Sequence, residues 1–306
     1  HQFGMPPASD EAQRDSPVAR AVADLLRHGP TYRQLRNLQD RRPHHGVRAG
    51  GPIDSIADAL PLLRPGERFS HSTSARVLGL PLQQSRTRSV HISSPPGIAP
   101  HRRAGIVGHQ APDDSAMIVN GIRISEPPQL FLELATEIEH PWLVAVGDAL
   151  VLNPRHPDPR SGHPFTTLEA LTQALAIPGR RGRREAIRAL ARVRLGAESP
   201  RETLLRILLE DAGLPPAQCG YPVHDGFGHL IGWFDLVWPE FSTIAEYDGD
   251  QHRTNDVQYD RDITRFDRAT EAGWRVVRVR KRGLDIAPAE TVRRTTTALL
   301  AGGWTP

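Results

Sequence analysis

Apolar positions recur along the chain with two different spacings, one typical of helices and one typical of strands. Residues 16–29 and 51–82 carry apolar positions at helical spacing. Short runs rich in β-branched residues follow, RSVHISS, GIVGHQ and MIVNGIRIS, separated by glycine, proline and aspartate. Helical spacing returns over residues 127–152. This alternation predicts an α+β N-terminal domain that extends over residues 1–155.

A helical, arginine-rich connector is predicted over residues 156–197. Within it, the run GRRGRREAIRALARVRLG places one apolar stripe on a single helical face and leaves the arginines on the other face. Arg188 and Arg192 lie on the basic face, which could contact DNA phosphates or could be only a solvated surface. The apolar stripe comprises Ala186, Ile187, Leu190, Ala191 and Leu195.

Residues 198–306 show the clearest succession of elements, in the order helix, three strands, helix, strand and a last helix. The first helix begins at SPRETLL, where Ser199 predicts the cap, Pro200 the first helical position and Glu202 the acid of a capping box. The Asp-Gly pair in VHDGFGHL predicts the turn of a hairpin between the first two strands. This part of the chain therefore has the pattern of a separate α/β domain.

Three carboxylates interrupt the predicted strands. Asp235 stands among apolar residues of the second strand, where a solitary charge is costly to bury without a partner. Glu246 and Asp248 end the third strand, and because side chains alternate along a strand they point to the same face. Acids that project from adjacent core strands need a cation or an arginine beside them.

Arginine supplies almost all of the positive charge of the chain. Lysine and arginine total 38 residues, of which only Lys281 is lysine, and the net charge is +3 with a pI near 9.5. The planar fork of arginine suits phosphate, although the same bias can reflect genomic composition. In the helix predicted over residues 256–273, Arg261 and Arg265 face outward and could bind DNA. Alternatively, either arginine could pair with the strand acids in a structural ion network.

Cysteine content and hydropathy indicate in which cellular compartment the protein is expected. The single cysteine, Cys219, excludes an internal disulfide and favours a reducing compartment. No stretch approaches the roughly 20 apolar residues of a membrane span, and no signal peptide is visible. We therefore expect a cytoplasmic protein with no membrane partner. The sequence does not decide the oligomeric state, and a homodimer is one possibility.

The C-terminal succession of elements resembles the core of the PD-(D/E)xK nuclease superfamily. The closer resemblance is to the DUF559 branch, related to very-short-patch-repair endonucleases, whose pattern joins a helix glutamate, a strand aspartate, E-x-D-G-x-Q-H, an arginine-rich helix and G-W-x-V-x-R. Here these pieces are Glu202, Asp235, EYDGDQH and GWRVVRVR. The resemblance implies an α/β restriction-endonuclease-like domain over residues 198–306, with a mixed central sheet flanked by helices.

The N-terminal half carries a second, partial resemblance. The runs FSHSTSARVLGLPL and GIRISEPPQLFLELA look like the domain that precedes this nuclease module in many actinobacterial proteins. That domain is often compared with the AbiEi-type antitoxins. The resemblance implies an AbiEi-like domain over residues 1–155.

The nuclease resemblance implies a metal-dependent DNA endonuclease or nickase in repair or defence, with Mg²⁺ or Mn²⁺ as cofactor. A hard divalent cation bound by oxygen ligands can assist phosphodiester hydrolysis. Asp235 and Glu246 would be the primary metal ligands. Glu202 would be a third ligand or would hold a water beside the metal, but capping alone also explains it.

The sequence departs from the superfamily at Asp248, which stands where lysine is usual. Aspartate cannot steady an attacking hydroxide as lysine does, but it can bind a metal, and it is also common before a turn glycine. The resemblance implies catalytic roles for Gln251 and for His252, with His252 as general base or proton relay. A histidine in a polar loop can equally be a surface residue.

A non-catalytic, antitoxin-like regulator that binds DNA and retains the nuclease fold is the alternative function. The missing lysine and the antitoxin-like N-terminal half favour the regulator. The intact pair of Asp235 and Glu246 favours the enzyme.

Overall fold

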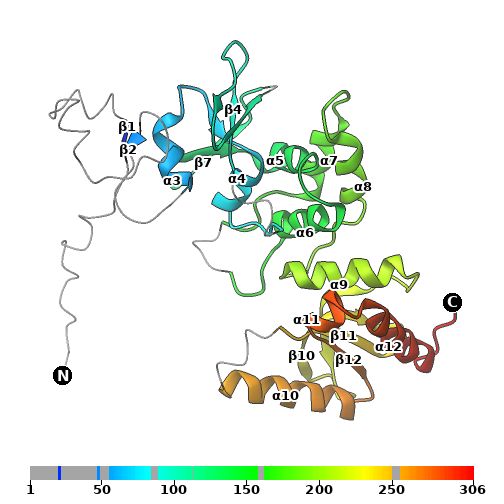
Figure 1. The fold of residues 1–306 in the computed structure, drawn as a ribbon. Coiled ribbons are helices and arrows are strands. Elements are labelled where there is room, and N and C mark those ends of the chain that lie inside the picture. The colour runs from blue at the N-terminus through cyan, green and yellow to red at the C-terminus, as the bar shows by residue number, and fades with distance from the viewer. Residues whose placement is uncertain are drawn as a thin grey trace, which may run out of the picture. The chain divides into compact units, whose positions relative to one another are not determined.

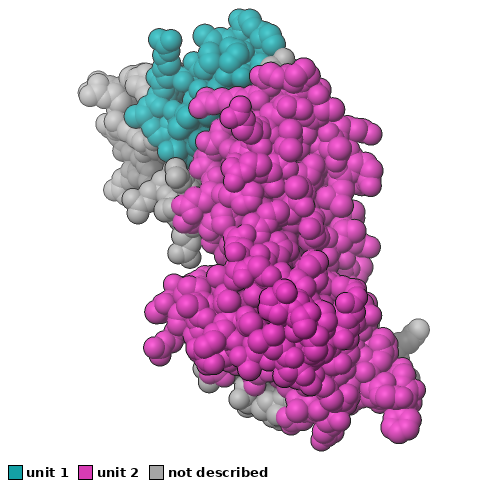
Figure 2. All heavy atoms as spheres, turned by 90° about the vertical axis from the view of Figure 1, so that its right-hand side faces the viewer, with its two compact units in different colours: residues 1–77, 85–125 teal, residues 78–84, 126–306 magenta. Residues whose placement is uncertain are grey.

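The chain forms two compact units of helices and mixed sheets, shown as a ribbon in Figure 1. Figure 2 colours residues 1–77 and 85–125 as the first unit, and residues 78–84 and 126–306 as the second. The computed structural model describes residues 20–21, 47–48, 55–83, 89–111, 113–157, 162–249 and 256–306, with only the backbone for residues 20, 21, 48, 55 and 256–263.

A six-stranded mixed sheet of order β5-β6-β4-β3-β8-β7 forms the first unit. β4 pairs in parallel with β6 and antiparallel with β3. Asn120 and Gly121 join β7 to β8 with φ of 49° and 78°, the left-handed geometry of a two-residue hairpin turn. The elements are α3 (Ser55–Ala59), η2 (Leu60–Leu62), β3 (Arg68–Phe69), α4 (His71–Val77), β4 (Val90–Ser94), β5 (Arg102–Arg103), β6 (Ile106–Gln110), β7 (Ala116–Val119) and β8 (Ile122–Ser125).

The helix predicted over residues 16–29 is wrong where the structure describes that range. β1 (Arg20–Ala21) pairs there with β2 (Val47–Arg48) in an antiparallel bridge. Pairing between segments so far apart in sequence leaves no trace in the local spacing of apolar residues.

Four helices open the second unit and pack with its C-terminal part. They are α5 (Pro127–Leu134), α6 (His140–Val151), α7 (Leu168–Ala176) and α8 (Arg183–Leu190). Asp148 on α6 accepts hydrogen bonds of 2.7 Å from both Arg206 Nη2 and Thr203 Oγ1 on α9 (Pro200–Asp211). The side chains of Asp148 and Arg206 are each only 1% exposed. Asp148 and Arg206 therefore lie in the same compact unit, which comprises residues 78–84 and 126–306.

The apolar stripe predicted on the arginine-rich connector is partly wrong. Ala186 is buried as expected, but Ile187 is 41% and Leu195 58% exposed. Ala189 and Val193 are buried in their place. Leu195 departs from the stripe because α8 ends at Leu190, so the helical spacing does not continue through the following turns.

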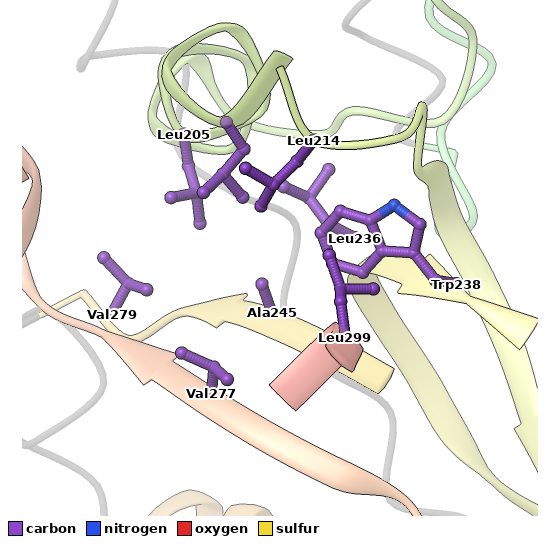
Figure 3. Packing of buried hydrophobic residues seen from close by; sticks show 9 residues of the cluster. Leu205, Leu214, Leu236, Trp238, Ala245, Val277, Val279 and Leu299 are labelled. Atoms are coloured by element: carbon purple, nitrogen blue, oxygen red, sulfur yellow. The ribbon is translucent and has the colours of Figure 1, made fainter. Parts of the chain in front are cut away.

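A four-stranded sheet of order β12-β11-β10-β9 forms the C-terminal part of the second unit, and only β11 and β12 are parallel. One apolar cluster contains Leu205 of α9, strand residues such as Leu236 and Ala245, and Leu299 of α12 (Figure 3). A second cluster includes Phe266 and Ala269 of α10. The elements are β9 (Gln218–His224), β10 (Leu230–Trp238), η4 (Pro239–Phe241), β11 (Thr243–Tyr247), α10 (Asp256–Glu271), β12 (Arg275–Val279), α11 (Lys281–Asp285) and α12 (Pro288–Ala301).

Candidate acidic site on the C-terminal sheet

Asp235 of β10 and Glu246 of β11 face each other across the sheet. The strands pair Leu236 with Ala245, so the same register sets Asp235 opposite Glu246. The backbone N–H of Asp235 donates to Glu246 Oε2 at 2.9 Å, and the N–H of Tyr247 donates to Asp235 Oδ2 at 2.7 Å. Each carboxylate is thus held by the strand that carries the other.

Glu202 joins this pair from the first turn of α9. Ser199 caps the helix by accepting a hydrogen bond of 3.2 Å from the N–H of Glu202. Glu202 Oε2 accepts 2.9 Å from the N–H of Glu198, one residue before the cap, so its carboxylate reaches past the position expected of a capping box. The side chain of Glu202 is buried, and its backbone N–H still takes part in the cap at Ser199.

Burial and mutual repulsion raise the pKa of two of these acids. Burial raises the pKa of Glu202 to about 7, and the nearby carboxylates of Glu246 and Glu198 add to the effect. The pKa of Asp235 lies well above its ordinary value, because of burial first and then because of Glu246 and Glu202. The three acids therefore form one electrostatic cluster, which we call the acid cluster: Glu202, Asp235 and Glu246.

Arg265 of α10 balances part of this negative charge. Its Nη2 donates to Glu246 Oε1 at 2.6 Å, and its Nη1 donates to the carbonyl of Trp233. The side chain predicted to face outward instead lies over β10, where Gly232 leaves room for it. A Cβ atom at Gly232 would stand 2.6 Å from Arg265 Cδ. The sequence-based alternative of an arginine paired with a strand acid is thus realised for Arg265 and Glu246.

Asp248 pairs with other arginines. Its Oδ2 accepts a hydrogen bond of 2.8 Å from Nη2 of Arg278 on β12, and one of 3.2 Å from Nε of Arg280, which follows β12. Its backbone N–H donates to the carbonyl of Val279, which continues the pairing of β11 and β12. Asp248 is therefore committed to these arginines in the structure.

The remaining predicted residues are only partly described. Gln251 and His252, and the side chain of Arg261, lie outside the described residues. Arg192 forms ion pairs with Glu210 at 2.9 Å and Asp211 at 2.7 Å. Arg188 bonds to Glu185 at 2.9 Å, and 67% of its side chain is exposed. Of these two connector arginines, Arg188 is the more accessible to a phosphate.

A pocket of about 1040 Å³ adjoins the acid cluster. Arg265 and Glu198 line it, together with Trp233 and Arg155. Arg155 donates to Glu198 through Nε and Nη2, each at 2.8 Å, and this pair lowers the pKa of the Glu198 carboxyl. The guanidinium of Arg155 lies 5.6 Å from the ring centroid of Trp233. Sequence reasoning missed Arg155, because it follows α6 and lies 80 positions before Asp235.

The donor chemistry of the acid cluster fits a hard divalent cation, since all three side chains offer carboxylate oxygens. Their crowding also helps to raise the pKa of Glu202 and Asp235, and a bound cation would offset the mutual repulsion of the ionised carboxylates. Within the described parts of the chain, however, the acids form no group of three whose ligand oxygens all lie within 4.8 Å of one another. Binding one ion would therefore require these side chains to converge, and Arg265 to release Glu246 Oε1.

Comparisons with known proteins give two relatives. No family model matches the chain. The chain is 27% identical over 206 residues to the uncharacterized proteins MT2308 and Rv2248 of Mycobacterium tuberculosis, strains CDC 1551 and H37Rv. The alignment covers 67% of this chain and 71% of each relative. In the described part of the chain, every helix is too short or too polar to cross a membrane.

Proposed function

We propose that the C-terminal part of the second unit is a restriction-endonuclease-like domain that hydrolyses phosphodiester bonds of DNA, with Mg²⁺ or Mn²⁺ as cofactor. The observation that carries the proposal is the acid cluster. Asp235 and Glu246 project from adjacent strands toward each other, and Glu202 adds a third buried carboxylate. Arg265, which pairs with Glu246, carries one positive charge, whereas the three acids would carry three negative charges if all were ionised.

Asp235, Glu246 and Glu202 would hold the cation, which when bound supplies positive charge to the phosphate that is attacked. Glu202 also exchanges a proton close to neutral pH, because burial raises its pKa to about 7 in the protein without a cation. Cation binding should therefore release this proton. The predicted relay by His252 would move a proton to or from the water or the leaving oxygen.

The pocket beside the acids offers groups suited to a nucleic acid strand. Arg155 can bind a phosphate if Glu198 yields part of its guanidinium. Trp233, which is 40% exposed, provides an aromatic face for a base or sugar. A strand placed in this pocket would lie next to the carboxylates that hold the cation.

The aspartate at position 248, where lysine is usual, is weaker evidence against catalysis because two arginines lie beside it. The usual lysine would place one positive charge at this position, whereas here Arg278 and Arg280 both pair with the Asp248 carboxylate. The net charge of this group of three is +1. Positive charge near the phosphate is thus supplied by β12 in the proposed enzyme.

One observation favours the alternative, a DNA-binding regulator that retains the fold without catalysis. Arg265 already occupies Glu246 Oε1 at 2.6 Å, as an ion pair that stabilises the sheet would do. If this pair were permanent, Glu246 would be unable to hold a cation, and the acid cluster would be structural.

Plasmid nicking decides between these functions. Purified full-length protein is incubated with supercoiled DNA and Mg²⁺ or Mn²⁺, with EDTA as the metal-free condition. We expect nicking that needs the cation and that falls by orders of magnitude in Asp235→Asn, which keeps the side-chain size but removes an anionic ligand. Asp225→Asn is the matched control, because Asp225 lies in the turn between β9 and β10 and asparagine suits that turn.

The regulator would be adopted on a different result. Wild-type protein would then show no metal-dependent cleavage of single-stranded, duplex, mismatched or branched DNA, while binding DNA with an affinity of nanomolar order. Equal nicking by wild type and Asp235→Asn would instead show that the acid cluster is not the catalytic site.

A further inference from the structure

Three histidines of the first unit bring their rings together. Among the described residues, one ligand nitrogen from each of His71, His91 and His109 lies within 4.8 Å of the other two. His91 Nδ1 and His109 Nε2 are 3.0 Å apart, and the ring of His71 stacks on that of His109 with centroids 3.8 Å apart. His71 and His91 are each only 8% exposed, and His109 is half-buried.

The sheet explains why these residues meet. β4 and β6 pair in parallel with His91 opposite Val107 and Ser93 opposite His109, so both histidines project from the same face. β3 lies beside β4, and His71 follows β3 at the start of α4. The cluster is therefore assembled from three segments that the sheet holds in a fixed arrangement.

Hydrogen bonds and backbone conformation hold the histidines in place. Ser70 Oγ lies 3.1 Å from His71 Nδ1, and Thr73 Oγ1 accepts 2.8 Å from the backbone N–H of His91. His71 has φ of 51°, a left-handed conformation that residues other than glycine adopt rarely. Such conformations cluster at binding and catalytic sites, where the surrounding structure enforces them.

We propose that His71, His91 and His109 bind one transition-metal ion of the zinc class. Neutral imidazole is a common ligand of such ions, at a metal–nitrogen distance of about 2.0–2.1 Å. Two nitrogens bound to one tetrahedral ion at that distance lie roughly 3.3 Å apart, close to the 3.0 Å between His91 and His109. Three protein ligands leave a fourth position for water or another small ligand.

This three-histidine site is independent of the proposed nuclease site. It lies in the first unit and offers nitrogen ligands, whereas the acid cluster lies in the second unit and offers oxygen ligands. Imidazole suits zinc, copper and nickel, and carboxylate suits magnesium and manganese. A protein that failed to cut DNA could therefore still bind zinc here.

Zinc stoichiometry tests the proposal. Metal-free full-length chain carrying Asp235→Asn, which removes one acid-cluster ligand, is dialysed against Zn²⁺ and its bound metal is measured. We expect His91→Gln and His109→Gln, each in this background, to lose one equivalent of Zn²⁺ per chain. His156→Gln is the matched control, because His156 is exposed and lies in the second unit, and it should lose none.

Cobalt gives a second readout that does not depend on the histidine variants. Co²⁺ bound to the Asp235→Asn chain should show the visible absorption of a nitrogen-bound ion with four or five ligands, and added Zn²⁺ should displace it. Equal Zn²⁺ content in the control and the two folded histidine variants would overturn the proposal. The contact between His91 and His109 would then be a hydrogen bond between neutral imidazoles. If circular dichroism shows that both variants fail to fold, absence of the Co²⁺ bands would overturn the proposal.

Discussion

Glu202 should give the acid cluster a pH signature in the stability of the second unit. Burial raises its pKa from 4.5 to about 7 in the folded protein. Between these two pH values the unfolded chain has lost the proton while the folded protein keeps it. Glu202 therefore contributes to the free energy of unfolding through the proton that the folded protein keeps. This contribution is complete below about pH 4.5, decreases as the pH rises, and is lost above about pH 7.

The size of the effect follows from the difference between the two pKa values. A difference of 2.5 units, 7 minus 4.5, corresponds to about 3 kcal/mol of unfolding free energy. Glu202→Gln removes the ionisable group but keeps an oxygen that can accept the N–H of Glu198. The free energy of unfolding of the variant minus that of wild type should therefore be about 3 kcal/mol larger at pH 8 than at pH 4.5.

Urea unfolding followed by tryptophan fluorescence measures this difference in the unit of interest, because all five tryptophans lie between residues 126 and 306. The titrations are run with EDTA at several values between pH 4.5 and 8. Glu240→Gln, at an exposed position, controls for the loss of one negative charge. Parallel pH profiles for wild type and Glu202→Gln would refute a buried acid with a raised pKa.

Two further predictions concern the interior of the second unit. Burial raises the pKa of the Cys219 thiol from 9.0 to about 11, so at pH 8 its thiolate fraction is about 100-fold lower. A disulfide reagent should therefore react far more slowly with native than with urea-unfolded protein, and similar rates would contradict this. Asp148→Ala removes the 2.7 Å carboxylate partner of the buried Arg206, which keeps its 3.1 Å pair with Glu210, and should cost about 3 kcal/mol in urea unfolding. Asp211→Ala, whose side chain is 62% exposed, is the control and should cost at most about 1 kcal/mol.

Local patterns predicted the elements of the C-terminal sheet well. The cap at Ser199, the first helical position at Pro200 and the succession of three strands, a helix and a fourth strand after this first helix all agree with the structure. Each depends on neighbours along one or two adjacent segments. Even the hairpin turn is where the Asp-Gly pair indicates, although Gly228 and not Gly226 adopts the left-handed conformation.

Contacts between distant segments could not be read from the sequence. Arg265 was expected on a solvated helix face, yet the missing side chain at Gly232 lets it reach Glu246. The three-histidine cluster depends on the strand order of the first sheet, which brings residues 71, 91 and 109 together. The pairing of α6 with α9 likewise depends on Asp148 and Arg206, which are 58 positions apart.

The pair of Arg265 and Glu246 connects the two functions considered for this protein. A cation bound by Glu246 Oε1 would repel the guanidinium that now occupies that oxygen. Arg265 already lines the neighbouring pocket, and its side chain occupies the space that the absence of a side chain at Gly232 provides. Under the proposed function, cation binding would therefore turn Arg265 toward the pocket, where a phosphate would be its next anionic partner. In a regulator the same arginine would stay on Glu246 and stabilise the sheet.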